Sequence, residues 1–175
     1  MDFSTFDTRS TAEAGTPMQI KDAFTGEPIM DGDKPCRVLV RGVASKTAQA
    51  EMRERQRAAM TAEPETDADD TRVMEDAHND LCGAAAPFII GFENVDRGDR
   101  PCEATPDDIE WFLDLTFPEM GPKTEDGKPV FEDDFDEGGK PIRRPVYELK
   151  NNPFAKQVSD HASSMRELLG NDSAA

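Results

Sequence analysis

The chain has 175 residues, of which 36% are hydrophobic and 33% are charged, and its formal net charge is -17. This length suits one domain of ordinary size, or a smaller domain with extended arms, and the low apolar content predicts that parts of the chain do not pack. The negative charge argues against nucleic acid and anionic membranes as partners, since both are polyanions, so neutral or basic proteins are expected.

Cysteine spacing and the first residues indicate the compartment. The three cysteines, Cys36, Cys82 and Cys102, lie far apart without Cys-x-x-Cys spacing, so neither a disulfide framework nor a zinc site is predicted. Residues 1–15 lack a basic segment followed by an apolar one, and no apolar run approaches the roughly 20 residues that span a bilayer. We therefore expect a soluble protein with reduced thiols that is not secreted.

The first part of the chain predicts an arm and then a hairpin. Residues 1–17 are small and polar apart from Phe3 and Phe6, and they predict a flexible N-terminal arm. Residues 18–120 are expected to form one compact unit of a β-hairpin and helices. Its hairpin comes from two short β-branched runs, because Gly, Asp and Pro turn signals separate them. Val38 and Val40 fall on one side of the second strand.

Three helices follow the hairpin within this unit. Ser45 is a suitable N-cap for a helix over 46–62, and acidic residues suit the start of a second helix over 67–86. Thr105, followed by a proline and two acidic residues, is a strong start for the third. A proline precedes the segment 88–95, and the sequence leaves open whether that segment is helix or strand.

Large apolar residues in the second half of this unit are the best core candidates. They are Phe88, Ile89, Ile90, Ile109, Trp111, Phe112, Leu113 and Phe117. Core packing is expected of these residues, rather than a pocket in which the aromatic rings line a cofactor. We predict no bound cofactor.

Residues 121–147 form an acidic excursion rich in proline and glycine. Within it, Asp-Gly-Lys-Pro-Val and Gly-Gly-Lys-Pro-Ile are near repeats on either side of an acidic run. The excursion holds a two-stranded ribbon of 129–132 against 141–149, or it stays mobile until a partner orders it. The predicted fold class is therefore α+β: a mainly α-helical body with a small N-terminal β-hairpin or meander and a long acidic loop excursion.

Residues 148–175 predict a C-terminal helix and tail. Phe154, Val158, Met165 and Leu169 recur at helical spacing along it. We predict that this stripe faces a partner protein. The alternative is that these side chains close over the core of the protein itself.

Residue patterns that carry catalysis are missing from the sequence. It has no Gly-x-x-x-x-Gly-Lys-Ser/Thr, Gly-x-Gly-x-x-Gly or Gly-x-Ser-x-Gly motif. The only histidines, His78 and His161, lack a second ligand at i+4 and are expected on the surface. A divalent ion at Asp133, Asp134 and Asp136 is the remaining metal hypothesis, although their spacing does not match an EF-hand. We therefore predict no enzyme, no catalytic residue and no resident metal.

The order of these elements resembles the tail assembly chaperones of long-tailed bacteriophages. The resemblance is carried, in order, by DAFTGEPI, RVLVRGVAS, an Arg-rich helix, an Ala-rich stretch ending in FIIGFENV, the segment ATPDDIEWFLDLTFPEM and the terminal NNPFAKQVSDHA. It covers most of the chain except 121–145. The chain departs from the family pattern at Phe92, where a tryptophan is frequent, and in the length of its acidic insertion.

This resemblance implies a non-catalytic protein that binds the tape measure protein and helps to recruit tail tube subunits around it. Such a protein works in the host cytoplasm during phage assembly and is a possible homo-oligomer. The negative charge would keep it soluble and repel its own copies, although solubility alone or disordered loops also explain such a charge. The alternative function is a structural virion protein, in capsid decoration, head-tail joining or the tail, that its neighbours order.

Overall fold

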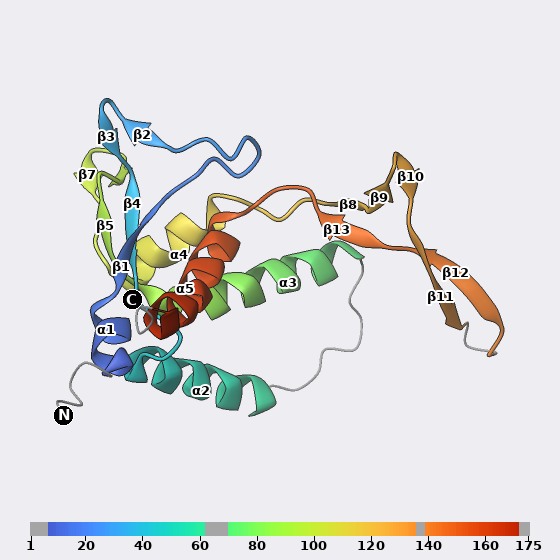
Figure 1. Cartoon of the computed structure of the whole chain (residues 1–175), viewed down its shortest axis with the longest axis horizontal. Helices are drawn as coiled ribbons and strands as arrows, with labels where there is room; N and C mark the ends of the chain where they lie inside the picture. The colour runs from blue at the N-terminus through green and yellow to red at the C-terminus, as the bar shows by residue number, and fades with distance from the viewer. Residues whose placement is uncertain (1–6, 62–69, 136–138, 172–175) are drawn as a thin grey trace.

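The computed structural model of this chain describes residues 7–61, 70–135 and 139–171. It contains both helices and small antiparallel sheets. Within these ranges the helices are α1 (Thr8–Ala14), α2 (Lys46–Thr61), α3 (Asp70–Ala85), α4 (Pro106–Asp114) and α5 (Phe154–Asn171), with a 3-10 turn η2 (Ala86–Phe88). The strands are β1 (Thr16–Gln19), β2 (Met30–Asp31), β3 (Lys34–Pro35), β4 (Arg37–Val40), β5 (Ile89–Glu93), β6 (Asp96–Arg97), β7 (Arg100–Pro101), β8 (Met120–Pro122), β9 (Thr124–Glu125), β10 (Lys128–Pro129), β11 (Phe131–Phe135), β12 (Pro141–Pro145) and β13 (Tyr147–Leu149). Figure 1 shows their arrangement.

The prediction of a mainly α-helical body is wrong, because strands pair throughout the chain (Figure 1). Most of these strands are only two or three residues long, which is too short for an alternating apolar pattern to be visible in the sequence. Tight turns define them instead. Between β9 and β10, for example, Asp126 and Gly127 both have positive φ, of 51° and 73°, as a type I′ hairpin turn requires.

The largest sheet has three antiparallel strands in the order β1-β4-β5. Met18 of β1 lies opposite Val38 of β4, and Val38 lies opposite Phe92 of β5 on its other side. The predicted hairpin is therefore confirmed, with the small hairpin of β2 and β3 inserted between its two strands. Val38 and Val40 are both fully buried, as their alternation predicts.

The segment 88–95, which the sequence left open, contains strand β5. Helix α3 ends at Ala85, and Pro87 lies in the 3-10 turn that follows, because proline has no N–H with which to continue the helical ladder. The β-branched Ile89 and Ile90 then enter the strand. This strand completes the sheet by pairing with β4 from much earlier in the chain.

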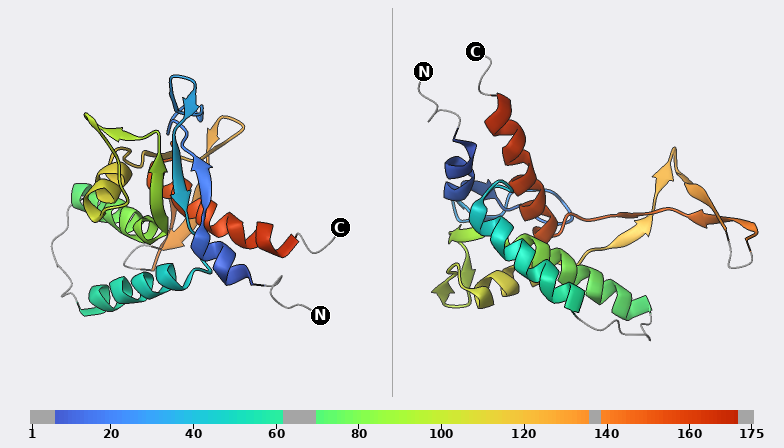
Figure 2. Two further views of the ribbon diagram at one scale, coloured as in Figure 1. Left: turned by 90° about the vertical axis from the view of Figure 1, so that its left-hand side faces the viewer. Right: turned by 90° about the horizontal axis from the view of Figure 1, so that it is seen from below.

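The core lies where helices α3, α4 and α5 meet the three-stranded sheet (Figures 1 and 2). Phe112 of α4 stacks on Phe154 of α5 with ring centroids 4.9 Å apart, and Phe92 of β5 meets Phe112 edge-on at 5.3 Å. The buried apolar residues of this core are Met18, Ile20, Cys36, Val38, Val40, Ala48, Ala85, Phe88, Ile89, Phe112, Leu113, Phe154, Ala155, Val158 and Ala162. Aromatic packing therefore joins the sheet to the two helices.

Most of the predicted core residues belong to this cluster. Four of them are buried in it, namely Phe88, Ile89, Phe112 and Leu113. Ile109 and Trp111 pack against it while partly exposed, and Ile90 is half-buried. The prediction is wrong for Phe117, which is 46% exposed. Phe117 follows the end of α4, where the chain is already leaving the body.

The described part of the predicted N-terminal arm is folded onto the body. Asp7 caps α1 by accepting a hydrogen bond from the N–H of Ser10 at 3.1 Å, and Ala12 is 1% exposed. The N–H of Gly42 donates to the carbonyl of Ala12 at 2.9 Å. The arm prediction also rested on Phe3 and Phe6, which lie outside the described residues.

The predicted helix starts at Ser45 and Thr105 are confirmed. The N–H of Ala48 donates to Ser45 Oγ at 3.1 Å, and the N–H of Asp108 donates to Thr105 Oγ1 at 3.3 Å. Ser45 Oγ in turn donates to the Glu13 carboxylate at 2.7 Å. Hydrogen bonds from Thr47 and Ser45 lower the pKa of Glu13 to about 2, so α1 is tied to the start of α2 by an ionised carboxylate.

A buried carboxylate holds the hairpin of β6 and β7 against α4. Asp108 is fully buried and accepts hydrogen bonds from Arg100 at 2.6 and 2.7 Å and from Arg97 at 3.0 Å. The N–H of Glu103 donates to the same carboxylate at 3.0 Å. The bonds from Arg100, then from Glu103 and Arg97, hold the pKa of Asp108 well below its usual range. The Asp108 carboxyl group is therefore ionised in the folded protein near neutral pH.

We expect Asp108→Asn to lower the melting temperature at pH 7 by several degrees, because two arginines lose their buried anion. Since the folded pKa is below the ordinary 3.8, the stabilisation by Asp108 is complete above that value and is lost as the pH falls below it. The difference in melting temperature between the wild type and Asp108→Asn should therefore shrink as the pH falls below 3.8. Circular dichroism melts across this range measure both effects, with Asp107→Asn, an exposed carboxylate in the same helical turn, as the control. Equal melting temperatures for the two variants at pH 7 would contradict this role.

Candidate functional site

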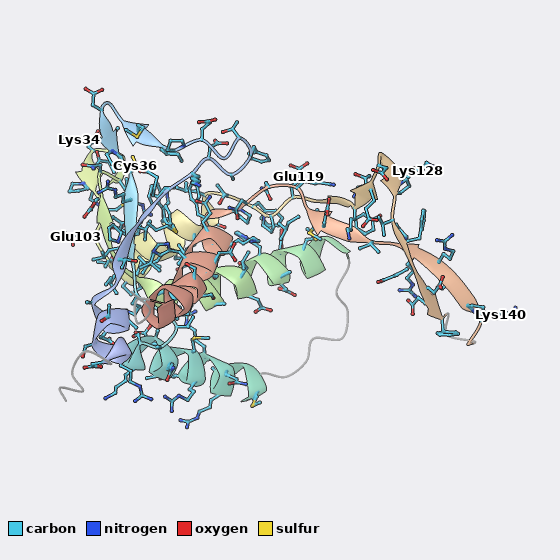
Figure 3. All side chains as sticks on the ribbon, in the orientation of Figure 1. Lys34, Cys36, Glu103, Glu119, Lys128 and Lys140 are labelled. Carbon is cyan, nitrogen blue, oxygen red and sulfur yellow. The ribbon has the colours of Figure 1, made fainter. Side chains whose placement is uncertain are left out.

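A projecting arm of paired strands is the most distinctive feature of the surface. The arm is defined here as residues 119–150, in its described ranges 119–135 and 139–150. Figure 1 and the right view of Figure 2 show that it extends away from the helices. Strands β8 and β13 pair at its base, β9 and β10 form a side hairpin, and β11 pairs with β12 at its far end. In Figure 3, Glu119 is labelled where the arm leaves the body and Lys140 near its far end.

The far end of the arm is a two-stranded ribbon, as one of the two alternatives expected, but its strands are 131–135 and 141–145 rather than 129–132 and 141–149, since 147–149 pair with β8 instead. Phe131 lies opposite Pro145, Asp133 opposite Arg143, and Phe135 opposite Pro141. The acidic run that separates the two near repeats forms most of β11, and the sequence did not show that the ribbon leaves the body.

One face of this ribbon is apolar at both ends and charged in the middle. Side chains alternate between the faces of a strand, so Phe131, Asp133 and Phe135 share one face of β11. Phe131 is 43% exposed and Phe135 is 66% exposed. The Arg143 guanidinium lies over the Phe131 ring, 5.4 Å from its centroid, and is 3.8 Å from the Asp133 carboxylate. The face therefore offers two accessible aromatic rings around an ion pair.

The base of the arm adds further apolar surface. Tyr147 is 58% exposed, Met120 is 43% exposed and Leu149 is 37% exposed. Exposed apolar side chains gathered on one feature of a surface mark a site of interaction with other molecules. Rigid aromatic side chains are also the most effective contacts at protein interfaces.

A buried asparagine anchors both chains of the arm to the body. Asn151 Oδ1 accepts a hydrogen bond from the N–H of Glu119 at 2.9 Å, and Asn151 Nδ2 donates to the carbonyl of Phe117 at 2.8 Å. The N–H of Lys150 donates to the carbonyl of Glu119 at 2.7 Å. The point at which the arm leaves the body is thus fixed by hydrogen bonds from both of its chains.

We expect Asn151→Ala to lower the free energy of unfolding by about 1–3 kcal/mol, because it removes two hydrogen bonds, one from the N–H of Glu119 and one to the carbonyl of Phe117, at about 0.5–1.5 kcal/mol each. Urea denaturation followed by circular dichroism measures the change. The control is Asn152→Ala, since the Asn152 side chain is exposed. An effect of Asn151→Ala no larger than that of the control would show that the anchor does not stabilise the fold.

The metal hypothesis finds no support in the arm. Asp133 and Asp134 lie on opposite faces of β11, and the Asp134 carboxylate is 2.8 Å from Arg144 Nε. Asp136, the third proposed ligand, lies outside the described residues. Among the residues that the structure describes, no group of three or more His, Cys, Asp and Glu side chains is placed to hold a metal ion.

Comparisons with known proteins find no match. No family model, no curated protein and no solved structure matches this chain. In the described ranges, none of the helices is long and apolar enough to cross a membrane. The resemblance to tail assembly chaperones therefore rests on the sequence order described above.

A group of cysteine, histidine and aspartate side chains lies between α3 and α4. His78, which the sequence placed on the surface, is 3% exposed, and its Nε2 is 2.9 Å from Asp114 Oδ1. Cys82 Sγ lies 3.6 Å from the same Nε2, and the Phe117 ring packs on the imidazole with centroids 4.7 Å apart. The i, i+4 spacing of His78 and Cys82 on one helix was the available signal for this group.

The geometry of this group does not activate the thiol. Burial, followed by the charges of Asp114 and Glu110, raises the pKa of Cys82 to about 11, so the thiol is protonated at neutral pH. A nucleophile, base and carboxylate acting together use both imidazole nitrogens, whereas here Cys82 and Asp114 both approach Nε2 most closely. The contact between His78 and Asp114 instead connects α3 to the end of α4.

Of the proposed partner-facing stripe of α5, the two residues whose side chains the structure describes, Phe154 and Val158, lie in the core. Phe154 is 7% exposed and Val158 is fully buried, so for these two residues the alternative, closure over the protein's own core, holds. The side chains of Met165 and Leu169 lie outside the described residues. A helical apolar stripe has the same sequence pattern whether it covers its own core or a partner.

His161, also expected on the surface, is half-buried on α5. Its Nε2 is 2.8 Å from Thr16 Oγ1 at the start of β1, and burial lowers its pKa. The neutral imidazole therefore joins the C-terminal helix to the sheet. Among the described residues, neither histidine belongs to a group of three or more side chains that could hold a metal ion.

Proposed function

We propose that this protein is a non-catalytic tail assembly chaperone of a long-tailed bacteriophage, which binds the tape measure protein and helps to recruit tail tube subunits. The observation that carries the proposal is the arm, whose aromatic and apolar side chains are exposed on strands that project from the body. The order of sequence elements from DAFTGEPI to NNPFAKQVSDHA supports the same family.

The physical properties of the arm favour binding to another protein. A two-stranded ribbon without a further layer is only marginally stable in water, so packing a partner against it stabilises the ribbon as well as the complex. Burying a phenylalanine side chain contributes about 1.5–3 kcal/mol. Phe131 and Phe135, which are 43% and 66% exposed, are placed to make this contribution.

The negative net charge of the chain favours some protein partners over others. With a net charge of -17, free copies of the chain repel each other, and a neutral or basic protein is the favoured partner. Such a protein stays soluble while its binding surface is exposed. These are the properties that a chaperone for a hydrophobic, helical tape measure protein requires.

The arm also supports a second function, that of a structural virion protein whose arm its neighbours order. Both functions use the same exposed side chains, but they differ in where the protein is found at the end of assembly. A chaperone leaves before the particle is complete, whereas a structural protein stays in it.

Size-exclusion chromatography of the purified chain with the tape measure protein of the same phage tests the proposed function. We expect the two proteins to elute together as a complex. Separate elution over a range of concentrations that extends above micromolar would overturn the proposal that this chain is a tape measure chaperone.

A further inference from the structure

A groove on the opposite part of the molecule from the arm's far end lies between α2 and α4, with α3 and η2 along its floor. Its volume is about 630 Å³. In the left view of Figure 2, these three helices lie on the same side of the body. The groove is separate from the arm, since none of its lining residues belongs to 119–150.

The groove is lined by apolar side chains and by more carboxylates than cations. Ala86, Ile109 and Trp111 supply apolar surface, and Trp111 is the only tryptophan in the chain. The groove is also lined by three carboxylates, those of Glu51, Glu110 and Asp114, and by one cationic side chain, that of Arg55. A ligand that fills the groove must therefore combine an apolar surface with positive charge.

The secondary structure of the residues that line the groove indicates which conformation a peptide ligand would adopt there. A peptide buried in an extended conformation needs partners for its backbone N–H and C=O groups, which a free strand edge provides. The residues that line this groove come from helices, the 3-10 turn and their ends, and none comes from a strand, so an extended peptide finds no strand edge along it. A helix brings its backbone hydrogen bonds with it and needs only side-chain contacts.

We propose that this groove binds a basic amphipathic helix of a partner protein. The apolar face of the helix would cover Ile109 and Trp111, and its lysine or arginine side chains would face Glu51, Glu110 and Asp114. This inference rests on the proposed function, since it states the chemistry of a helical partner, and it adds a second contact surface to the arm.

Fluorescence of Trp111 tests the inference directly, because it is the only tryptophan and it lines the groove. The probe is a synthetic amphipathic peptide of about 18 residues with leucine on one helical face and lysine on the other. We expect a saturable change in Trp111 emission at one peptide per chain. The same peptide with glutamate in place of lysine should give no change. Absence of a saturable change with the lysine peptide would overturn the inference.

Matched charge reversals separate binding in the groove from general attraction to an acidic protein. Glu110→Lys should raise the Kd for the lysine peptide at least tenfold. Glu75→Lys, at an exposed position of α3 outside the groove, changes the net charge equally and should raise it less than twofold. Equal effects of the two substitutions would overturn the inference, because net charge alone would then explain binding.

A neutral substitution tests the apolar contribution, and it should leave the fold intact because Ile109 is partly exposed. Ile109→Gln should raise the Kd for the lysine peptide about tenfold without changing the charge. An unchanged Kd would overturn the proposed placement of the helix.

Failure of this inference can be told apart from failure of the proposed function. If the peptide does not bind while the chain still elutes with the tape measure protein, only the groove inference is overturned. If the peptide binds in a Glu110-dependent way without a tape measure complex, the groove chemistry stands and the chaperone function is overturned.

Discussion

Replacing Phe131 and Phe135 together by serine is expected to raise the Kd for the tape measure protein by roughly a hundredfold. At the lower end of the usual range, two phenylalanine side chains contribute about 3 kcal/mol when they are buried in an interface. A change of 1.4 kcal/mol corresponds to a factor of ten in Kd. Both rings are exposed in the free protein, so their loss should leave the folded body intact.

Isothermal titration calorimetry of the double variant against the wild type measures this loss. The matched control is Phe24→Ser, because Phe24 is 68% exposed on the segment between β1 and β2 and is not part of the arm. The control should bind as the wild type does. If the double variant also binds with unchanged Kd, the arm is not the surface that contacts the tape measure protein.

The largest effect on stability is expected from Phe112→Ala, which should lower the free energy of unfolding by about 3–5 kcal/mol. Phe112 is 1% exposed, stacks on Phe154 and meets Phe92 edge-on, so its removal leaves a cavity between the sheet and two helices. A domain of ordinary stability has only about 5–15 kcal/mol in total. The variant should therefore unfold at a much lower urea concentration.

Urea denaturation followed by circular dichroism checks this value. Phe24→Ala removes the same side chain from an exposed site and should change the free energy of unfolding by no more than about 0.5 kcal/mol. A loss of less than about 1 kcal/mol for Phe112→Ala would mean that the three aromatic rings do not form the centre of the core.

Local sequence signals predicted local structure well. Ser45 and Thr105 cap the helices that they were expected to cap, since a cap depends on residues three positions away. The hairpin of β1 and β4 also follows from a short apolar alternation and its turns. A two-stranded ribbon in the arm was one of two alternatives for the same reason, although its first strand covers 131–135 rather than 129–132.

Features that depend on distant parts of the chain were not predictable in this way. Strand β5 pairs with β4 although two helices separate them in the sequence. No residue pattern in either strand predicts this pairing. His78 is buried because Phe117 and Asp114 come to it from the far end of α4. A polar residue on a charged helix has no local pattern that indicates this burial.

The candidate site was only partly visible in the sequence. The stripe of Phe154 and Val158 was expected to face a partner, but both residues belong to the core. Phe131, by contrast, was expected in a ribbon or in a mobile excursion, and neither alternative indicated that Phe131 and Phe135 are exposed aromatic rings. Exposure depends on where the arm points, which the sequence does not specify.

The assembly role of this protein is tested most directly by quantitative mass spectrometry of purified phage particles beside the lysate that produced them. If the protein is a tail assembly chaperone, it will be abundant in the lysate and absent from the particles. If it is found in the particles in stoichiometric copies with known virion proteins, the chaperone function is contradicted and the protein is a structural component of the virion.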